Sequence, residues 1–434
     1  MPTAPIANEI NSTSYVLTVV LYLVSLTLAP QEWIGPFIGL PTDYICFVIM
    51  FVALVGNGRI VNCFKLSPLD MLLVMFATLV TVSAIKAGWT AVGQDRVIFY
   101  WKMVLLVKLV EGLIDNIGHL RAVTVCVVAL GVLLAIQAIH QKLSVDGMGW
   151  ANQGRGWIDP IAAAAGEKGR SRWIGNFGGQ GTSAVLLTTA YPFTLAFLIR
   201  QHGIFKKLVA AIAASLLLWG IYCTGSRGGL LAILSVTSLY IMIRAKISAA
   251  SILKVSALVL VVYALAPSHL TTVVDSSNST QYRVEMWAAG LDMLKGNPVL
   301  GVGPGHFKVW SGKLIGHNSA VELQGELGIF GLLIWLSMIF LSLKGVLAYR
   351  AHTTDEREKW FATGLALSLT GYVVSAMFVT LEYETFYLLL AFCAVLNRCL
   401  PNPVSLTRKD MWTIVTIAGA WLLVLQFFVI VYIG

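Results

Sequence analysis

Apolar segments of roughly twenty residues, separated by short polar connections, recur along the whole 434-residue chain. A helix that crosses the hydrocarbon core of a bilayer needs about 20 mainly apolar residues. The first two segments are weakly apolar, and the last is also compatible with a helix lying on the membrane surface. We therefore expect a single all-α integral membrane domain over residues 1–434. Its twelve or thirteen predicted spans are 15–30, 40–57, 69–87, 97–114, 121–139, 182–200, 206–223, 227–244, 251–267, 320–347, 361–379, 382–399 and 411–433.

The composition agrees with a membrane protein. Hydrophobic residues make up 57% of the chain and charged residues only 12%, whereas a soluble domain carries about 25% charge. Mean hydropathy is +0.80. None of the six cysteines lies in the long connections 140–181 and 268–319. We therefore predict neither a disulfide framework nor a metal site built on cysteines.

The basic residues predict the orientation of the chain. Short connections on the cytoplasmic side of a membrane protein are enriched in Lys and Arg. In this chain every even-numbered connection is basic. The N-terminus is then inside, and the odd-numbered connections, including 140–181 and 268–319, face outward. We attribute the net charge of +9 to this retention and not to nucleic-acid binding. The residues that carry the bias are Arg59, Lys65, Arg121, Arg200, Lys206, Lys207, Arg244, Lys246, Lys254, Lys344, Arg350, Arg357, Lys359, Arg398, Arg408 and Lys409.

The outward connection 140–181 keeps basic residues that the retention rule would remove, among them Arg155, Lys168, Arg170 and Arg172. Guanidinium groups match phosphate oxygens with two parallel hydrogen bonds and keep their charge. These arginines therefore indicate an anion-binding loop. The alternative is that they pair with nearby carboxylates or with outer lipid headgroups, and we interpret Lys168 and Arg170 as solvated.

A further outward arginine lies in the tight connection Ser226-Arg227-Gly228-Gly229 between two spans. Glycines let helix backbones approach closely there. An arginine at such a turn is costly unless it has a partner. We expect Arg227 to point into a central cavity that holds an anion, with contact to outer headgroups as the alternative.

Connection 268–319 predicts a surface helix over 279–295, with apolar positions at Val284, Trp287, Leu291 and Leu294. The sequence Gly296-Asn297-Pro298 ends this helix. Arg283 lies four residues before Trp287, and so on nearly the same face. The glycine-rich turn over 301–305 is weak evidence for a phosphate-binding loop, because many tight turns have this composition.

His317 stands just before a predicted helix. Ser319 and Glu322 form a capping-box pattern that places the helix N-terminus at Asn318 or Ser319. The positive end of a helix favours anions and a neutral imidazole, and a neutral imidazole is a competent general base near neutral pH. The alternatives are a histidine that only hydrogen-bonds the helix end, or His306 or Glu285 as the base.

In order and spacing, these motifs resemble the O-antigen ligase and polymerase superfamily of bacterial inner-membrane enzymes. The resemblance covers roughly residues 200–380. It implies a GT-C-like membrane fold of about a dozen helices, with a large periplasmic loop, here 268–319, that carries short helices. The matching motifs are Ser226-Arg227-Gly228-Gly229, Tyr282-Arg283 with Trp287, Gly301 to Gly305, His317-Asn318-Ser319 and Gly328-Ile329-Phe330-Gly331.

The resemblance implies metal-independent glycosyl transfer with inversion at the periplasmic face and without a cofactor. The donor would be a glycan on undecaprenyl diphosphate, and the acceptor would be lipid A–core oligosaccharide. Arg227 and Arg283 match family positions and would stabilise the diphosphate leaving group. His317 matches the family histidine proposed to deprotonate the acceptor. Further substrate-binding residues are predicted at Arg155, Arg172, Lys102, Trp287, Tyr282 and Asn318.

Several alternatives remain open at this point. A polymerase would use another lipid-linked repeat as acceptor, and a ligase for protein acceptors commonly has a longer C-terminal region. The total length and modest outer loops favour the lipopolysaccharide ligase. A flippase or other transporter predicts internal repeats and charges on both sides of the midplane. The sparse charges in the spans are chiefly Lys102, near the outer face, and Lys108 with Glu111, which are spaced to pair with each other. A structural scaffold would leave the outward arginines unexplained.

Overall fold

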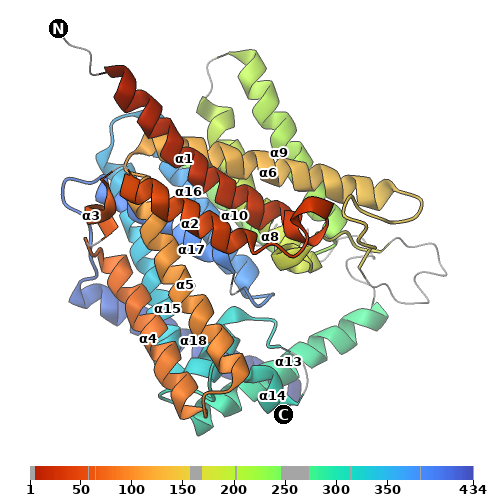
Figure 1. The fold of residues 1–434 in the computed structure, drawn as a ribbon. Helices are drawn as coiled ribbons and strands as arrows, with labels where there is room; N and C mark the ends of the chain where they lie inside the picture. The colour runs from red at the N-terminus through yellow and green to blue at the C-terminus, as the bar shows by residue number, and fades with distance from the viewer. Residues whose placement is uncertain are drawn as a thin grey trace.

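A computed structural model describes residues 5–56, 58–63, 65–156, 169–200, 203–245, 273–312, 315–381 and 383–433. These residues form helices and irregular connections, with no strand among them (Figure 1). In chain order the helices are α1 (Pro5–Leu28), η1 (Pro30–Glu32), η2 (Gly35–Phe37), α2 (Thr42–Gly56), α3 (Ile60–Cys63), α4 (Pro68–Lys86), α5 (Ala91–Leu113), α6 (Ile117–Leu143), η3 (Gly175–Phe177), α8 (Gln180–Arg200), α9 (Ile204–Thr224), α10 (Arg227–Ala245), α13 (Val273–Gly296), α14 (Phe307–Ser311), α15 (Ser319–His352), α16 (Glu356–Ala376), α17 (Glu384–Arg398) and α18 (Arg408–Ile433).

Every predicted span within the described residues coincides with one helix, and span 251–267 lies outside them. Eight of the described helices are long and apolar enough to cross a membrane. Helices α2 and α17 have only 15 residues each, and α5 carries Lys102, Lys108 and Glu111 along its length. The chain is therefore an all-α polytopic membrane protein, and the number of crossings remains a prediction.

The odd-numbered connections and the helix ends beside them lie at one end of the helix bundle, where hydrogen bonds link them in pairs. The donor–acceptor distances are 2.8 to 3.0 Å. The linked pairs are Thr27 with Trp173, Lys86 with Asn297, Ser171 with Cys223, and Ser319 with Leu381.

The connections after spans 2, 4, 10 and 12, with the helix ends beside them, meet at the opposite end. Arg59 pairs with Asp115 at 2.9 Å, and Lys344 pairs with Asp410 at 2.6 Å. A guanidinium nitrogen of Arg398 donates to the carbonyl of Ile114 at 3.1 Å. For these four connections the alternation predicted from the basic residues agrees with the packing. Which end faces outward remains a prediction.

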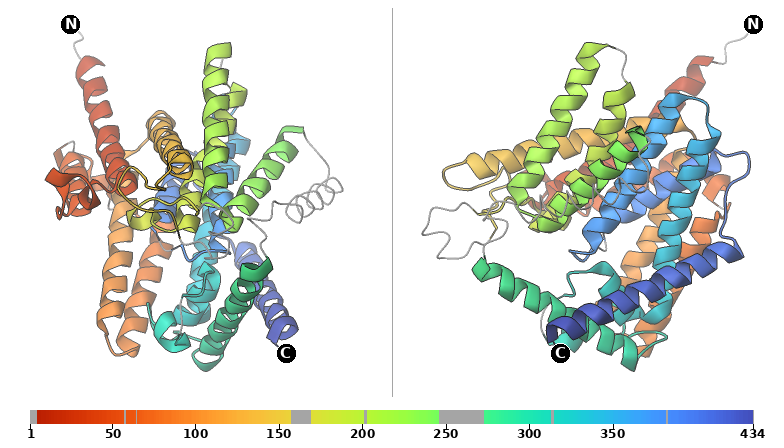
Figure 2. Two further views of the ribbon diagram at one scale, coloured as in Figure 1. Left: turned by 90° about the vertical axis from the view of Figure 1, so that its right-hand side faces the viewer. Right: turned by 180° about the vertical axis from the view of Figure 1, so that it is seen from behind.

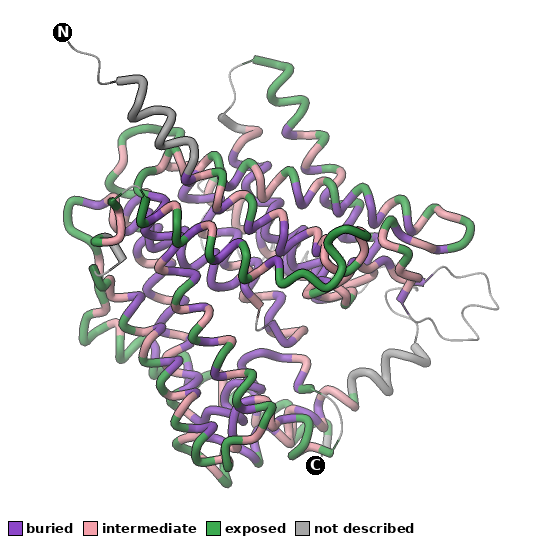
Figure 3. The backbone as a smooth tube through the Cα atoms, in the orientation of Figure 1, coloured by how far each residue is buried: buried purple, intermediate pink, exposed green. Residues whose placement is uncertain are grey.

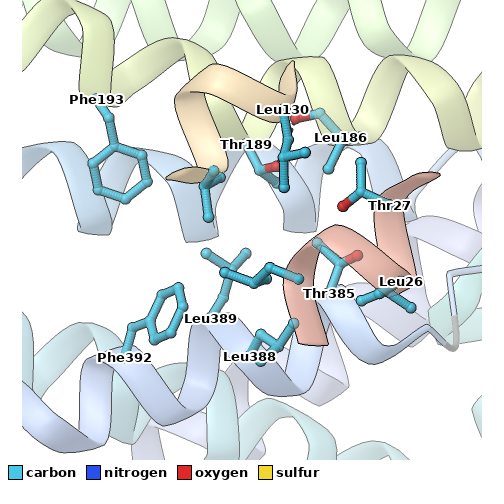
Figure 4. A pocket seen from close by; sticks show the side chains of 12 residues that line it. Leu26, Thr27, Leu130, Leu186, Thr189, Phe193, Thr385, Leu388, Leu389 and Phe392 are labelled. Carbon is cyan, nitrogen blue, oxygen red and sulfur yellow. Dashed lines mark hydrogen bonds between the residues drawn. The ribbon is translucent and has the colours of Figure 1, made fainter. Parts of the chain in front are cut away.

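The centre of the bundle is formed by α8, α15, α16 and α17, where buried residues are concentrated, whereas the outward sides of α4 and α9 are largely exposed (Figure 3). Helix α17 is apolar on all sides and is buried almost throughout. A small void of about 30 Å³ lies between α1, α6, α8 and α17 (Figure 4). Leucines, phenylalanines and threonines line this void, so it has the character of a packing gap and not of a polar binding site.

Helix α13 begins earlier than the predicted helix 279–295 and packs against α15 and α18 (Figure 2). Of the apolar positions of the predicted surface helix, Val284 and Leu291 are buried. Met286 and Met293 are buried as well, and both belong to the apolar cluster that α13 forms with α15 and α18. The apolar face of α13 is therefore covered mainly by protein. Helix α18 also joins this packing, with the Trp421 indole donating to Gln324 at 3.0 Å.

Helix α15 is interrupted at Gly328, where φ is 69° and ψ is −165°. The interruption frees the N–H of Ile329, which donates to the carbonyl of Pro298 at 2.9 Å. A Cβ atom at Gly328 would lie 2.6 Å from the backbone of Val299. Only glycine fits this position, and the connection that follows α13 docks into the break in α15.

The turn Gly301–Gly305 packs on the same part of α15. The N–H of Gly303 donates to the carbonyl of Glu326 at 3.0 Å. The buried carboxylate of Glu326 accepts from the N–H groups of Gly305 and Phe307 at 2.7 and 2.8 Å. These N–H groups are committed to α15, so the turn anchors the connection and is not available as a phosphate-binding loop.

This docking predicts that Gly301→Ala is far more damaging than Gly312→Ala. Both glycines have a left-handed backbone, with φ of 65° at Gly301 and 63° at Gly312. An alanine in this conformation should therefore lower the free energy of unfolding by about 1–2 kcal/mol at either position. A Cβ atom at Gly301 would also lie 2.1 Å from the carbonyl carbon of Glu326, whereas Gly312 has open space around it. Thermal unfolding in detergent should show the larger loss for Gly301→Ala. Equal losses in the two variants would contradict the docked turn.

Candidate functional site

A cavity of about 480 Å³ lies at the end of the bundle where the odd-numbered connections meet. Three arginines and one histidine line it, and none of the lining residues that the structure describes is Asp or Glu. The cavity therefore carries an excess of positive charge. Its lining consists of Arg170, residues 175–176, 178–182 and 225–228, Arg283, Ile315, His317, residues 378–380 and Tyr383.

Three long helices begin at this cavity. Helix α8 starts at Gln180, α10 starts at Arg227, and α15 starts at Ser319, two residues after His317. The N-terminus of a helix carries a partial positive charge and directs N–H groups outward. The helix ends therefore add to the charge of the arginines, and the arrangement suits an anion.

Glycines allow these helix ends to approach the connection after α16. A Cβ atom at Gly181 would lie 2.4 Å from a methyl carbon of Val379, and one at Gly228 would lie 2.7 Å from Cβ of Phe378. Contacts this short require a residue without a side chain. The glycine after Arg227 therefore permits the close approach that the sequence predicts.

The structure brings together the three residues that we predicted as catalytic. Arg227 is the first residue of α10, Arg283 lies on α13, and His317 lies directly before α15. All three line the cavity. Ser226 fixes the start of α10 by accepting the N–H of Gly229 at 3.2 Å. The catalytic roles of these residues remain predictions.

The backbone of His317 is held in an uncommon conformation. Its φ is 49°, in the left-handed region that histidine adopts more readily than most residues. On one side, the N–H of Gly316 donates to the carboxylate of Glu322 at 3.2 Å. On the other side, the side chain of Asn318 caps α15. The imidazole is therefore presented to the cavity by a backbone that is fixed at both neighbours.

The environment of His317 favours the neutral imidazole. Burial lowers its pKa from the ordinary value of 6.5, and the positive charge of Arg283 lowers it further. At neutral pH the ring is therefore uncharged, and one of its nitrogens can accept a proton. This is the state that a general base needs before the reaction.

Asn318 caps α15 and is not in the lining of the cavity, so its position does not support our prediction that it binds substrate. Its side-chain oxygen accepts from the first turn of α15 at 3.0 and 3.2 Å, and its amide nitrogen donates to the carbonyl of Met377 at 3.1 Å. The predicted capping box is also absent. The Ser319 hydroxyl bonds the carbonyl of Val379 at 3.2 Å instead, and Glu322 bonds Gly316.

Arg170, which we had interpreted as solvated, is the third arginine of the cavity. Its side chain crosses Gly225, where an added Cβ atom would lie 3.0 Å from Cγ of Arg170. One guanidinium nitrogen donates to Gln180 at 3.4 Å. The next residue, Ser171, donates its N–H to Cys223 at 3.0 Å, which fixes the backbone. No local motif distinguishes Arg170 from the neighbouring arginines, so the sequence alone did not identify it.

Arg155 and Arg172 do not line the cavity, and our prediction that they bind diphosphate is not supported by their positions. Arg155 donates to the carbonyls of Gln141, at 3.1 Å, and Ser144. Arg172 donates to the carbonyl of Gly154 at 3.0 Å. Both side chains therefore hold the connection after α6 together by satisfying its backbone carbonyls.

Lys102 also lies outside the lining. Its ammonium group lies 3.4 Å from Glu384 and 3.8 Å from Asp43. It therefore neutralises carboxylates behind the cavity, and the predicted direct contact with diphosphate is not supported.

Trp287 and Tyr282 belong to an apolar cluster between α13, α15 and α18, and neither lines the cavity. The Trp287 ring meets Phe428 edge to face, with ring centroids 6.4 Å apart. Packing against α18 accounts for its position, so the structure does not support the prediction that Trp287 and Tyr282 bind the substrate.

The alternative bases lie elsewhere. His306 contacts the Thr90 hydroxyl and the Pro304 carbonyl, each at 3.0 Å. Neither His306 nor Glu285 lines the cavity. Lys168, the other residue that we had interpreted as solvated, lies outside the described residues. Among the candidates for a base, only His317 shares the cavity with arginines.

Comparison with known proteins gives one result. Residues 212–336 match a family model described as O-antigen ligase. The matched segment contains Arg227, Arg283 and His317, and ends within α15. No curated protein sequence matches the chain.

The contacts predict different effects on stability for two arginines of the same connection. Arg155→Ala removes charged hydrogen bonds to backbone carbonyls, each worth about 1.5–3 kcal/mol, and should lower the temperature of unfolding clearly. Arg170→Ala removes one of three like charges in the cavity together with a long contact to Gln180 at 3.4 Å, and should lower it less. Thermal unfolding of both variants in detergent checks this. A larger loss for Arg170→Ala would show that Arg170 has the structural role.

Proposed function

We propose that the chain is a glycosyltransferase of the bacterial inner membrane and belongs to the O-antigen ligase/polymerase superfamily, because residues 212–336 match a family model described as O-antigen ligase. The family supports ligase or polymerase activity. The proposed reaction moves O-antigen glycan from undecaprenyl diphosphate to lipid A–core oligosaccharide at the periplasmic face. The acceptor distinguishes the two activities, because a polymerase would extend a second lipid-linked glycan.

One observation carries this proposal. Arg170, Arg227 and Arg283 line one cavity with His317, without a described Asp or Glu in the lining. A diphosphate is the anion that such a set of guanidinium groups and helix N-termini suits. His317 beside this anion site can act as the general base that deprotonates an acceptor hydroxyl.

The proposed chemistry is a single displacement. The neutral imidazole of His317 takes the proton of the acceptor hydroxyl while the oxygen attacks the anomeric carbon of the donor. The bond between this carbon and the diphosphate oxygen breaks, and configuration inverts. Negative charge grows on the departing diphosphate, where the fixed guanidinium groups stabilise it most in the transition state. The proton remains on His317 until solvent removes it.

The polar arrangement favours an enzyme over a transporter. Transporter sites usually lie near the bilayer midplane, between repeated halves. Here the cavity is built from connections and helix ends at one end of the bundle. A scaffold without activity would not need a fixed histidine beside three arginines.

The lipopolysaccharide gel pattern of a deletion strain tests the function. For a ligase, we expect a change from smooth to rough lipopolysaccharide, with long-chain lipid-linked glycan accumulating. Accumulation of single lipid-linked repeats would identify a polymerase instead. An unchanged pattern, with neither product accumulating, would reject both.

We predict that His317→Ala folds normally and loses transfer by at least about 10²-fold, because the cap of α15 at Asn318 remains. In the unmodified protein, transfer should fall as pH drops through the pKa of His317, which lies below 6.5. The sign follows from the base role, since protonation removes the acceptor of the proton. The measurement is the rate of in vitro transfer as a function of pH.

His306→Ala is the matched control and should keep both the rate and the pH dependence, because His306 contacts Thr90 and Pro304 away from the cavity. Near-normal transfer by His317→Ala would exclude His317 as the base.

We further predict that Arg227→Lys and Arg283→Lys each lose on the order of 10²-fold in turnover at saturating donor. Lysine keeps the charge but lacks the two-pronged geometry, and one lost contact to transition-state charge has about this effect. Arg170→Lys should be impaired as well, since Arg170 lines the same cavity. Arg408→Lys, an exposed site at the other end of the bundle, is the control. Full activity in all the cavity variants would mean that the diphosphate binds elsewhere.

A further inference from the structure

The turn η3 (Gly175–Phe177) places one amide side chain in the lining of the arginine cavity. Asn176 lines the cavity, and its amide nitrogen donates to Oε2 of Glu384 at 2.8 Å. Glu384 is the first residue of α17 and is only 4% exposed. The amide therefore bridges a buried carboxylate and the open space of the cavity.

The partner of Asn176 decides which way the amide points. The other carboxylate oxygen of Glu384 accepts a hydrogen bond from the ammonium group of Lys102 at 3.4 Å. Both carboxylate oxygens of Glu384 are therefore acceptors, and the –NH₂ group of Asn176 is the donor that faces Glu384. The carbonyl oxygen, Oδ1, is then on the other branch of the planar amide.

The turn itself cannot move freely. The N–H of Gly175, at φ 58°, donates to Oε2 of Glu32 at 3.1 Å. Phe177, on the other side of Asn176, is 2% exposed and packs in the core. Within the described part of the chain, no group donates to Oδ1 of Asn176. This oxygen is therefore a fixed acceptor that remains available at the cavity.

A fixed acceptor differs from the rest of the charged lining. The guanidinium groups of Arg170, Arg227 and Arg283 can only donate hydrogen bonds. Diphosphate oxygens can only accept, so they suit the arginines and not Oδ1 of Asn176. A sugar hydroxyl can donate to Oδ1. Tyr383, directly before Glu384 in the chain, adds an aromatic ring to the same lining, and such rings combine an apolar face with a polar tip.

We propose that Asn176 binds a sugar hydroxyl of the lipid-linked donor, and that Glu384, balanced by Lys102, is the positioning residue that turns its amide oxygen toward the cavity. This inference rests on the proposed function. In this proposal the arginines of the lining bind the diphosphate, and Asn176 binds the sugar attached to it.

The test compares the binding of two lipids to purified full-length protein in detergent. One is undecaprenyl diphosphate, and the other is the lipid-linked O-antigen extracted from the deletion strain. Asn176→Ala should weaken binding of the glycosylated lipid about fivefold, as expected for one neutral hydrogen bond, and leave the bare lipid unchanged. Asn402→Ala, at the other end of the bundle, should bind both lipids normally. Binding of the bare lipid also reports that the cavity of each variant is folded.

The positioning role of Glu384 is tested separately, by the same lipid-binding measurement. Glu384→Gln removes the carboxylate that fixes the amide and should also weaken binding of the glycosylated lipid selectively. The double variant Glu384→Gln/Asn176→Ala should bind no more weakly than Asn176→Ala alone, because both changes remove the same contact. Additive losses would overturn the positioning role of Glu384.

Two failures are distinguishable. If Asn176→Ala binds both lipids as the unmodified protein does, or weakens both equally while Arg227→Lys weakens both, the cavity binds diphosphate and the sugar-binding role of Asn176 is wrong. If Arg227→Lys and Arg283→Lys bind both lipids normally and also keep full transfer, the cavity is not the donor site, and the proposed function and this inference both fail.

Discussion

The gathering of three guanidinium groups at one cavity is the constraint on which the rest of this end of the molecule depends. Arg170, Arg227 and Arg283 share a lining in which the structure describes no carboxylate. Three helix N-termini add further positive potential. Like charges and helix ends must be brought to one place to form such a site, so the surrounding backbone has to be held in position by further interactions.

The carboxylates near the cavity provide this support by binding backbone or amide groups. Glu322 accepts the N–H of Gly316, Glu326 accepts two N–H groups of the docked turn, and Glu384 holds Asn176. All three are buried. A carboxylate used in this way fixes the connections. It also stays out of the lining, where it would neutralise an arginine and compete with the substrate.

The sequence predicted the parts of the fold that depend on repeating patterns. Apolar length located the helices, and the alternation of basic connections agreed with which connections meet in space. The short motifs identified Arg227, Arg283 and His317, which share one cavity. The predicted substrate-binding role of Arg155 and Arg172 is not supported, because these side chains bond backbone carbonyls more than ten residues away, at Gln141 and Gly154. The sequence shows that each residue is charged but does not show which group it contacts. Arg170 was missed for the same reason, since only the fold brings it across Gly225. Asn318 was misjudged because a residue that caps a helix and one that binds a ligand look alike in sequence.

The arginines and the histidine also influence each other through charge. The positive charge of Arg283 contributes to the lowered pKa of His317 and so keeps the imidazole neutral in the empty cavity. A bound diphosphate would offset that charge, and the pKa of His317 would then rise toward its ordinary value. The imidazole would become a stronger base only once the donor is in place. In the proposed reaction, the cations that stabilise the leaving group therefore also delay protonation of the base, because a protonated His317 would be a fourth positive charge in the same cavity.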